Sequence, residues 1–204
     1  MKKSHHLYGN KLFWLNKRIF DIVMSLLLLP CLLIVVIFLI VFNGFYNKGR
    51  LLFIQERMGK DCKTFLAIKF RTMSSVSEIT RKYDDPIEID RITPLGRILR
   101  KTRIDELPQI LNVIKGDMSL IGPRPDYYVH ALEYLNSVQG YYNRHTIRPG
   151  ITGLSQVRLG YVDDLEAIQK KVFIDNYYIQ NPSYIIEFKI IFNTILIILL
   201  GKGK

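Results

Sequence analysis

The chain has 204 residues, a formal net charge of +11 at pH 7 and 49% hydrophobic residues. This length allows one modest domain with an appendage. The only two cysteines, Cys31 and Cys62, lie in segments of very different polarity, which excludes a disulfide framework and indicates a reduced, cytosol-facing protein. The sequence contains no phosphate-binding glycine loop, no dinucleotide fingerprint and no metal-ligand spacing of histidines.

The first predicted element is the apolar run from Ile22 to Phe42, which is interrupted only by Ser25 and Pro30. About 20 apolar residues suffice for a helix to cross the hydrocarbon core. The run is too long for the core of a signal peptide, and no small-residue cleavage site follows it. We therefore predict an N-terminal tail over residues 1–15 and a retained membrane segment over 16–46.

Basic residues flank this segment on both sides, among them Lys17 and Arg18 before it and Lys48 and Arg50 after it. Cytoplasmic flanks carry the Lys/Arg excess, so a straight span would place one basic flank on the wrong side. A central proline removes a backbone hydrogen bond and kinks a helix. This pattern favours a re-entrant helix broken at Pro30. The alternative is a spanning helix that tolerates its proline.

Residues 47–204 are predicted to form a cytosolic, membrane-associated domain. Residues 51–73 have the pattern of a β-hairpin that turns at Gly59-Lys60-Asp61, and residues 74–90 that of a polar surface loop. Thr93 and Pro94 predict the start of a helix that carries basic residues. Asp105 is the next candidate N-cap, for a helix that runs to about Lys115 and stops at Gly116.

Helical patterns follow over residues 126–142 and 164–178, and an apolar C-terminal segment over 184–200 is expected to lie along the membrane interface. The predicted fold class is therefore α+β and mainly helical. It combines a re-entrant membrane helix with a catalytic domain that carries a small β-hairpin and interfacial amphipathic helices.

The adjacent carboxylates of Asp105 and Glu106 are the first candidates for chemistry. Their ordinary interpretation is a helix cap beside a residue that complements the helix dipole. The same geometry would keep a carboxylate ionised, and an ionised carboxylate can attack phosphorus. A neighbouring carboxylate could hold Mg²⁺, which prefers oxygen ligands and often bridges to phosphate. The sequence therefore leaves open whether the pair is a cap or a catalytic centre.

Cations recur in the loops around this pair. Arg124 stands between two prolines, Arg148 lies in a Pro-Gly loop, and Lys69 and Arg71 end the predicted hairpin. Guanidinium groups suit bidentate phosphate contact, and a pre-positioned side chain loses little entropy on binding. The alternative for each is an exposed salt bridge or attraction to anionic lipid headgroups.

The stretches LFIQERMGKDCKTFLAIKFRTM, LRKTRIDELPQILNVIKGDMSLIGPRP and RPGITGLSQV follow KRIFDI and a proline-broken apolar helix. In this order, they resemble the bacterial sugar transferase family, the small monotopic polyprenyl-phosphate phosphoglycosyltransferases. The resemblance extends from about Asn16 to about Phe192. It departs from the family pattern at Leu29-Pro30, where Ser-Pro is frequent, and at Arg103, where a small residue is frequent.

The resemblance implies transfer of a phosphosugar from a nucleoside diphosphate sugar, usually a UDP-sugar, to polyprenyl (undecaprenyl) phosphate, with release of UMP. This would be the first membrane step in the assembly of a capsule, a lipopolysaccharide, an exopolysaccharide or another glycoconjugate. Asp105 would form a covalent aspartyl phosphosugar, and Glu106, with Asp105 beside it, would hold Mg²⁺. The resemblance assigns Lys69, Arg124 and Asp175 to the substrate site, to which we add Arg71 and Arg148 on chemical grounds.

By the same resemblance, Lys17 and Arg18 would meet lipid headgroups where the helix enters the membrane. The expected location is the bacterial inner membrane, with the catalytic domain on its cytosolic leaflet. Glycosyltransferases of the same pathway and a second copy of the chain are further partners to consider. Two other functions compete. A non-catalytic membrane scaffold would not need Asp105, and a nucleic-acid binder would need a groove-reading element, which the sequence does not show.

Overall fold

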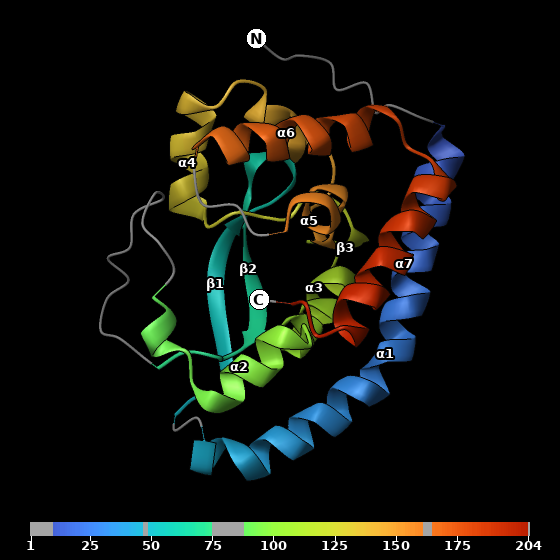
Figure 1. Cartoon of the computed structure of the whole chain (residues 1–204). Helices are drawn as coiled ribbons and strands as arrows, with labels where there is room; N and C mark the ends of the chain where they lie inside the picture. Colours follow the sequence, from blue (N-terminus) through green and yellow to red (C-terminus); the bar gives the residue numbers. More distant parts are fainter. Residues whose placement is uncertain (1–9, 47–48, 75–87, 161–164, 204) are drawn as a thin grey trace.

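The computed structural model describes residues 10–46, 49–74, 88–160 and 165–203. Two small sheets lie among helices, and the long α1 runs along one side of the molecule (Figure 1). The strands are β1 (Leu52–Met58), β2 (Thr64–Phe70), β3 (Ser119–Ile121) and β4 (Gly150–Thr152). The α-helices are α1 (Lys11–Tyr46), α2 (Pro94–Lys101), α3 (Ile110–Lys115), α4 (Tyr128–Ser137), α5 (Leu154–Leu159), α6 (Leu165–Gln180) and α7 (Tyr184–Leu199). Short 3₁₀ helices are η1 (Lys60–Cys62), η2 (Ile89–Arg91), η3 (Ile104–Gln109) and η4 (Tyr141–His145).

Helix α1 is continuous through Pro30, so the expected break is instead a bend, and Figure 1 shows the helix changing direction along its length. A proline interior to a helix loses one hydrogen bond and clashes with the preceding turn, which bends the helix without ending it. The helix begins at Lys11 and not at residue 16. Its extra turn is held by aromatic packing, because the ring centroid of Phe13 lies 5.0 Å from that of Tyr184.

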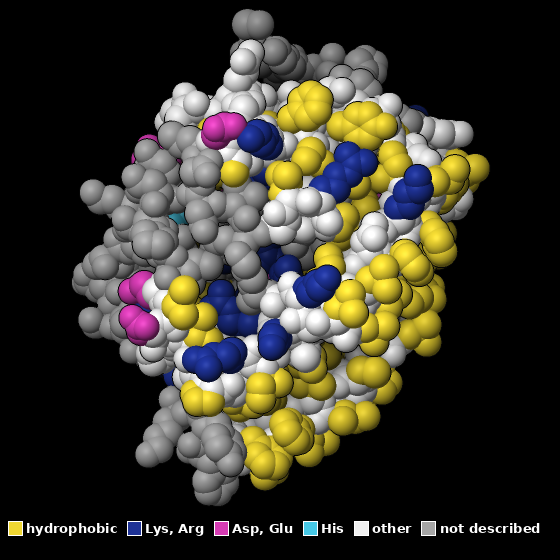
Figure 2. Space-filling model, in the orientation of Figure 1, with side chains coloured by type: hydrophobic (Ala, Val, Ile, Leu, Met, Phe, Trp, Pro, Cys, Tyr) yellow, Lys and Arg dark blue, Asp and Glu magenta, His cyan; other side chains and the backbone are white. Residues whose placement is uncertain are grey.

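One face of α1 is apolar and exposed, and the other packs on the rest of the protein. Among the described residues, α1 is the one helix long and apolar enough to cross a membrane by length and composition. Leu32 and Leu39 are buried in a cluster with Phe70 of β2, Leu99 of α2 and Ile110 of α3. Figure 2 shows apolar side chains gathered along the edge where α1 and α7 lie. The exposed ones include Leu15, Ile19, Leu27, Ile34, Ile37, Ile40, Ile185, Phe188, Phe192 and Leu199.

The predicted hairpin is confirmed. Strands β1 and β2 pair antiparallel, with Leu52 opposite Phe70 and Met58 opposite Thr64. Helix α3 is fastened to this hairpin by Asn112, whose side chain accepts a hydrogen bond from Ile68 N at 3.1 Å and donates one to Leu66 O at 2.7 Å. This amide reproduces the pairing of a neighbouring strand, so the helix is locked in register against β2.

The predicted start of α2 is confirmed, because Thr93 Oγ1 accepts a hydrogen bond from Gly96 N at 3.0 Å and Pro94 is the first helical residue. The predicted stop at Gly116 is also confirmed, with a φ of 102° there. The predicted N-cap at Asp105 is wrong. The residue that caps η3 is Arg103, which has a left-handed backbone (φ 58°) and no capping side-chain bond.

Strands β3 and β4 were not predicted, and they form a short parallel pair in which Ser119 is opposite Gly150. The loop that follows β3 also bonds to both ends of β4: Gly122 N donates to Thr152 O at 2.8 Å, and Gly150 N donates to Pro123 O at 2.9 Å. A Cβ at Gly150 would stand 2.1 Å from Gly122 N, so no side chain fits there. This contact places the Pro-Arg-Pro loop.

The remaining helical predictions hold with changed bounds. The helix expected over 126–142 is α4 followed by η4, and that over 164–178 is α6. Helix α7 matches the expected C-terminal segment and exposes Ile185 and Phe188 while it buries Glu187. The polar loop predicted over 74–90 lies largely outside the described residues. Both Cys31 and Cys62 are free, as expected.

Candidate active site

Asp105 and Glu106 lie in η3, beneath the end of strand β2. Asp105 is half-buried, and its Oδ1 is buried without a hydrogen-bond partner among the described residues. Burial, together with the charge of Glu106, raises the pKa of Asp105 to about 6, against the opposing effect of Lys69 and Arg124. A pKa of about 6 still leaves this carboxylate mostly ionised at neutral pH, although no helix cap at Asp105 holds it so. Asp105 ionises near pH 6 because cations offset only part of the cost of its burial.

Glu106 is buried and held by three cations. Its Oε1 accepts a hydrogen bond from Lys69 Nζ at 3.0 Å and another from the guanidinium of Arg124. Its Oε2 lies 3.7 Å from Arg103 NH1. Burial alone would raise the pKa of Glu106, but Arg124 and Lys69 hold it well below its usual range. Glu106 is therefore an anion at neutral pH.

Two of these cations approach the acid pair from separate elements. Lys69 lies near the end of β2, where burial lowers the pKa of its ammonium to about 8 although Glu106 opposes the shift. Burial would also lower the pKa of Arg124, and Glu106 reverses this and raises it. A cavity of about 10 Å³ lies beside them, lined by Lys69, Arg124, Arg57, Ala67, Gln109 and Pro125. The site thus presents fixed positive charge next to a carboxylate oxygen that has no hydrogen-bond partner in the described part of the chain.

A buried ionic network supports the loop of Arg124. Arg144, only 2% exposed, donates to the carbonyl oxygen of Arg124 at 2.8 Å. The same guanidinium binds Asp126 Oδ2 at 2.6 Å and Asp175 Oδ2 at 2.8 Å. Lys171 completes the network at 2.6 Å from Asp126 Oδ1. Sequence reasoning missed Arg144, Asp126 and Lys171 as functional residues, and no local signal marks them.

The contacts that place Asp175, Arg71 and Arg148 are with residues other than Asp105 and Glu106. Asp175 is fully buried against Arg144. Its carboxylate therefore holds Arg144, which in turn supports the Arg124 loop. The Arg71 guanidinium lies against Gly49, 2.6 Å from where a Cβ of that glycine would stand. Arg148 donates from Nε to Gly116 O at 2.8 Å, at the far end of α3.

The two basic residues expected at lipid headgroups are already engaged within the protein. Lys17 is buried and pairs with Glu187 Oε2 at 2.7 Å, and Glu187 also accepts a hydrogen bond from Tyr178. Arg18 donates to Val113 O at 2.8 Å and to Ile114 O at 3.3 Å. Lys17 and Arg18 therefore fasten α1 to α7 and α3. A headgroup contact by Lys17 would require this buried pair to open.

The donor set at the acid pair fits Mg²⁺ in one way. No group of three or more His, Cys, Asp or Glu side chains comes together in the part of the chain that the structure describes. Mg²⁺ needs only one or two carboxylates when substrate phosphates supply further oxygens. The partner-less Asp105 Oδ1 and the Oε2 of Glu106 are such donors. Because Lys69 and Arg124 repel a lone dication, these residues would hold the ion only together with an anionic ligand such as a diphosphate.

A family model described as bacterial sugar transferase matches residues 12–201. The chain belongs to the bacterial sugar transferase family. The matched region includes all but the first residue of α1, the acid pair and α7, so the match covers the long apolar helix as well as the candidate site.

Curated relatives carry specific names. Over 98% of its length, the chain is 37% identical to a UDP-N-acetylgalactosamine-undecaprenyl-phosphate N-acetylgalactosaminephosphotransferase of Aeromonas hydrophila, of which it spans 49%. It is 39% identical, over 88% of its length, to a UDP-glucose:undecaprenyl-phosphate glucose-1-phosphate transferase of Klebsiella pneumoniae, of which it spans 39%. It is also 39% identical to the exopolysaccharide production protein PSS of Rhizobium leguminosarum bv. phaseoli, with 92% and 97% of the two chains covered. The chain thus spans half or less of the first two relatives and nearly all of the third.

Proposed function

We propose that this member of the family transfers a phosphosugar from a UDP-sugar to undecaprenyl phosphate and releases UMP. The observation that carries the proposal is the carboxylate oxygen of Asp105, which has no hydrogen-bond partner among the residues described and is set beside Lys69 and Arg124 in a domain fastened to an apolar helix. The names of the Aeromonas and Klebsiella relatives supply the substrate class. The reaction would be the first membrane step of a bacterial glycoconjugate pathway.

In the first step, a carboxylate oxygen of Asp105 attacks the β-phosphorus of the nucleotide sugar. The bond from this phosphorus to the bridging oxygen breaks, and UMP leaves with that electron pair. An oxygen of the lipid phosphate then attacks the same phosphorus, the aspartyl–phosphorus bond breaks, and the carboxylate is restored. Covalent catalysis of this kind divides one difficult transfer into two easier ones.

The cations around Glu106 reduce the repulsion between the Asp105 carboxylate and the diphosphate that it attacks. Lys69 and Arg124 are fixed by Glu106 before substrate arrives, so they require little reorganisation to face a diphosphate. Guanidinium and ammonium groups offset the charge that develops on the phosphoryl oxygens. When bound, Mg²⁺ would add Lewis-acid stabilisation of the leaving UMP, held by Glu106 and Asp105.

The packing of α1 supports a monotopic arrangement. Its N-terminal half contacts the domain through Lys17 and Glu187, and its C-terminal half through Leu39, which is 1% exposed in the cluster around Phe70 and Leu99. A domain on one side of the bilayer cannot hold both ends of a helix that crosses it. The contacts at both ends of α1, together with its bend, therefore support a re-entrant helix in the cytosolic leaflet of the inner membrane.

Cysteine labelling tests this topology. Single cysteines in place of Lys11 and Arg50, in a background with Cys31 and Cys62 replaced by serine, flank α1 at exposed positions. We expect a membrane-impermeant maleimide to label both in inverted membrane vesicles and neither in intact spheroplasts. If one of the two cysteines were labelled in intact spheroplasts and the other in inverted vesicles, α1 would span the bilayer.

The activity is tested by supplying membranes that contain the protein with single UDP-sugars, Mg²⁺ and undecaprenyl phosphate. We expect release of UMP with at least one UDP-sugar, in proportion to the lipid phosphate supplied. Membranes from cells that lack the protein are the control. UMP release that proceeds to the same extent without lipid phosphate would contradict the assigned acceptor.

A further inference from the structure

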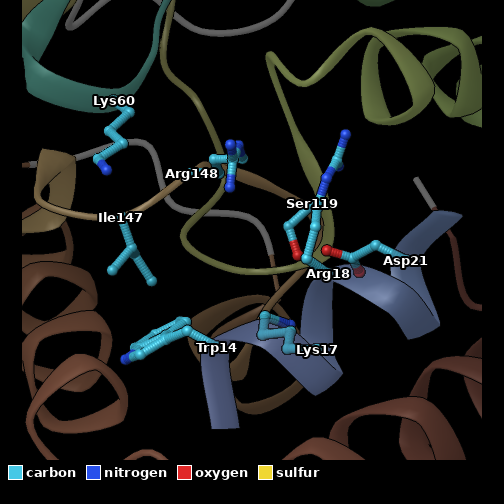
Figure 3. A pocket seen from close by; sticks show the side chains of 8 residues that line it. All are labelled: Trp14, Lys17, Arg18, Asp21, Lys60, Ser119, Ile147 and Arg148. Carbon is cyan, nitrogen blue, oxygen red and sulfur yellow. The ribbon is translucent and has the colours of Figure 1, made fainter. Parts of the chain in front are cut away.

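A second polar cavity lies at the end of α3 remote from Asp105, where the first turns of α1 meet the β1–β2 turn and the loop before β4 (Figure 3). Its volume is about 80 Å³, against about 10 Å³ for the cavity beside Lys69 and Arg124. A cavity needs roughly 10–15 Å³ of this kind of space for one water, so several waters, or one tetrahedral oxyanion, fit here. The cavity is lined by Trp14, Lys17, Arg18, Asp21, Lys60, Ser119, Ile147 and Arg148.

Two of the lining cations are neutralised or engaged by the protein itself. Lys17 forms its ion pair with Glu187 at 2.7 Å. Arg18 donates to the carbonyls at the end of α3, and in Figure 3 its guanidinium points away from the centre of the cavity. Asp21, the one acid in the lining, accepts a hydrogen bond from Leu120 N at 3.0 Å. Asp21 is thus one anion among three lining cations, Arg18, Lys60 and Arg148, that form no ion pair within the described residues, so the lining keeps an excess of positive charge.

Lys60 and Arg148 are the lining cations with nitrogens left for a ligand. Arg148 is held through Nε by Gly116 O at 2.8 Å, which leaves its terminal nitrogens for a ligand. The Lys60 ammonium makes no hydrogen bond or ion pair with any residue that the structure describes. They belong to different elements and line the same cavity, so an anion is their natural complement. Phosphate oxygens suit both a guanidinium and an ammonium.

The position of the cavity beside the exposed apolar surface indicates the source of the phosphate. The lining residues Trp14 and Arg18 share the first turns of α1 with Leu15 and Ile19, which are 57% and 53% exposed. Tryptophan is enriched where protein meets the membrane–water interface. The cavity therefore opens at the border of the apolar surface, at headgroup depth. We propose that it binds the phosphate of an anionic lipid headgroup, between Lys60 and Arg148, and so holds the start of α1 at the interface.

The single tryptophan of the chain makes the proposal directly measurable, because Trp14 lines the cavity. The full chain in non-ionic detergent is titrated with dioctanoyl phosphatidylglycerol, dioctanoyl phosphatidylcholine or inorganic phosphate, and the Trp14 fluorescence is followed. We expect a saturable change with phosphatidylglycerol only. The double variant Lys60→Gln/Arg148→Gln should weaken binding at least tenfold.

The matched control is Lys63→Gln/Arg158→Gln, which removes the same two charges at exposed positions outside the cavity. It should bind phosphatidylglycerol within twofold of the unaltered protein. Equal binding by the cavity variant would overturn the proposal, and equal saturation by inorganic phosphate would overturn its lipid source. Asp105→Asn protein should titrate normally, so this result does not depend on the proposed transfer activity.

Discussion

Replacing Asp105 with asparagine should abolish UMP release and leave no covalent phosphosugar on the protein. The amide cannot serve as the attacking nucleophile, so we expect turnover to fall by a factor on the order of 10⁴ or more. Intact-protein mass spectrometry, with UDP-sugar present and lipid phosphate absent, should show the adduct on the unaltered chain alone. Asp90→Asn, at an exposed carboxylate, is the control and should keep full activity. Normal turnover by the Asp105 variant would rule out the covalent route and favour direct transfer.

The same substitution should stabilise the protein. The folded-state pKa of Asp105 is about 6, above its ordinary value of 3.8, so the folded protein loses stability as pH rises through this range. About two pKa units correspond to about 3 kcal/mol. Thermal unfolding should therefore show Asp105→Asn as the more stable protein above pH 6, with the difference gone below about pH 4. A constant difference across this range would contradict the assigned pKa.

Replacing Arg144 with methionine should destabilise the fold and stop transfer. The change leaves Asp175 buried without its cation and removes the donor that holds the Arg124 carbonyl. Breaking a buried ion pair in this way costs roughly 3–5 kcal/mol. For a chain of this size, that corresponds to a fall in melting temperature on the order of 10 °C. Thermal unfolding in detergent measures this.

Lysine at position 144 separates stability from positioning. It keeps a buried positive charge near Asp126 and Asp175 but lacks the planar fork that reaches both carboxylates and the Arg124 carbonyl. We expect most of the stability to return while UMP release stays at least tenfold low, chiefly through a raised KM for the nucleotide sugar. Arg158→Met is the surface control. Full activity of Arg144→Lys would show that the network does not position Arg124.

Local sequence signals predicted the elements whose stability is local. The Thr93-Pro94 start of α2 and the Gly116 stop of α3 depend on backbone groups within one helical turn, and both are present in the structure. The hairpin follows from two apolar runs around one turn. The predicted cap at Asp105 is wrong because tertiary packing, and not local structure, determines the backbone there. The left-handed backbone of Arg103 turns the chain into η3 and packs the acid pair under β2, where burial outweighs any local capping preference.

The order of the motifs predicted the family and the acid pair, because these residues are contiguous or lie at fixed spacings in the chain. The pairing of β3 with β4 joins segments about 30 residues apart in the chain. A strand of three residues is too short to carry a sequence pattern that identifies its partner. The same is true of Arg144, Asp126 and Asp175, which meet only when η4 and α6 pack behind the Arg124 loop. Sequence alone thus indicated the groups to which we assign the chemistry. The tertiary structure decided their charge states and supports, because burial and long-range ion pairs exist only in the folded chain.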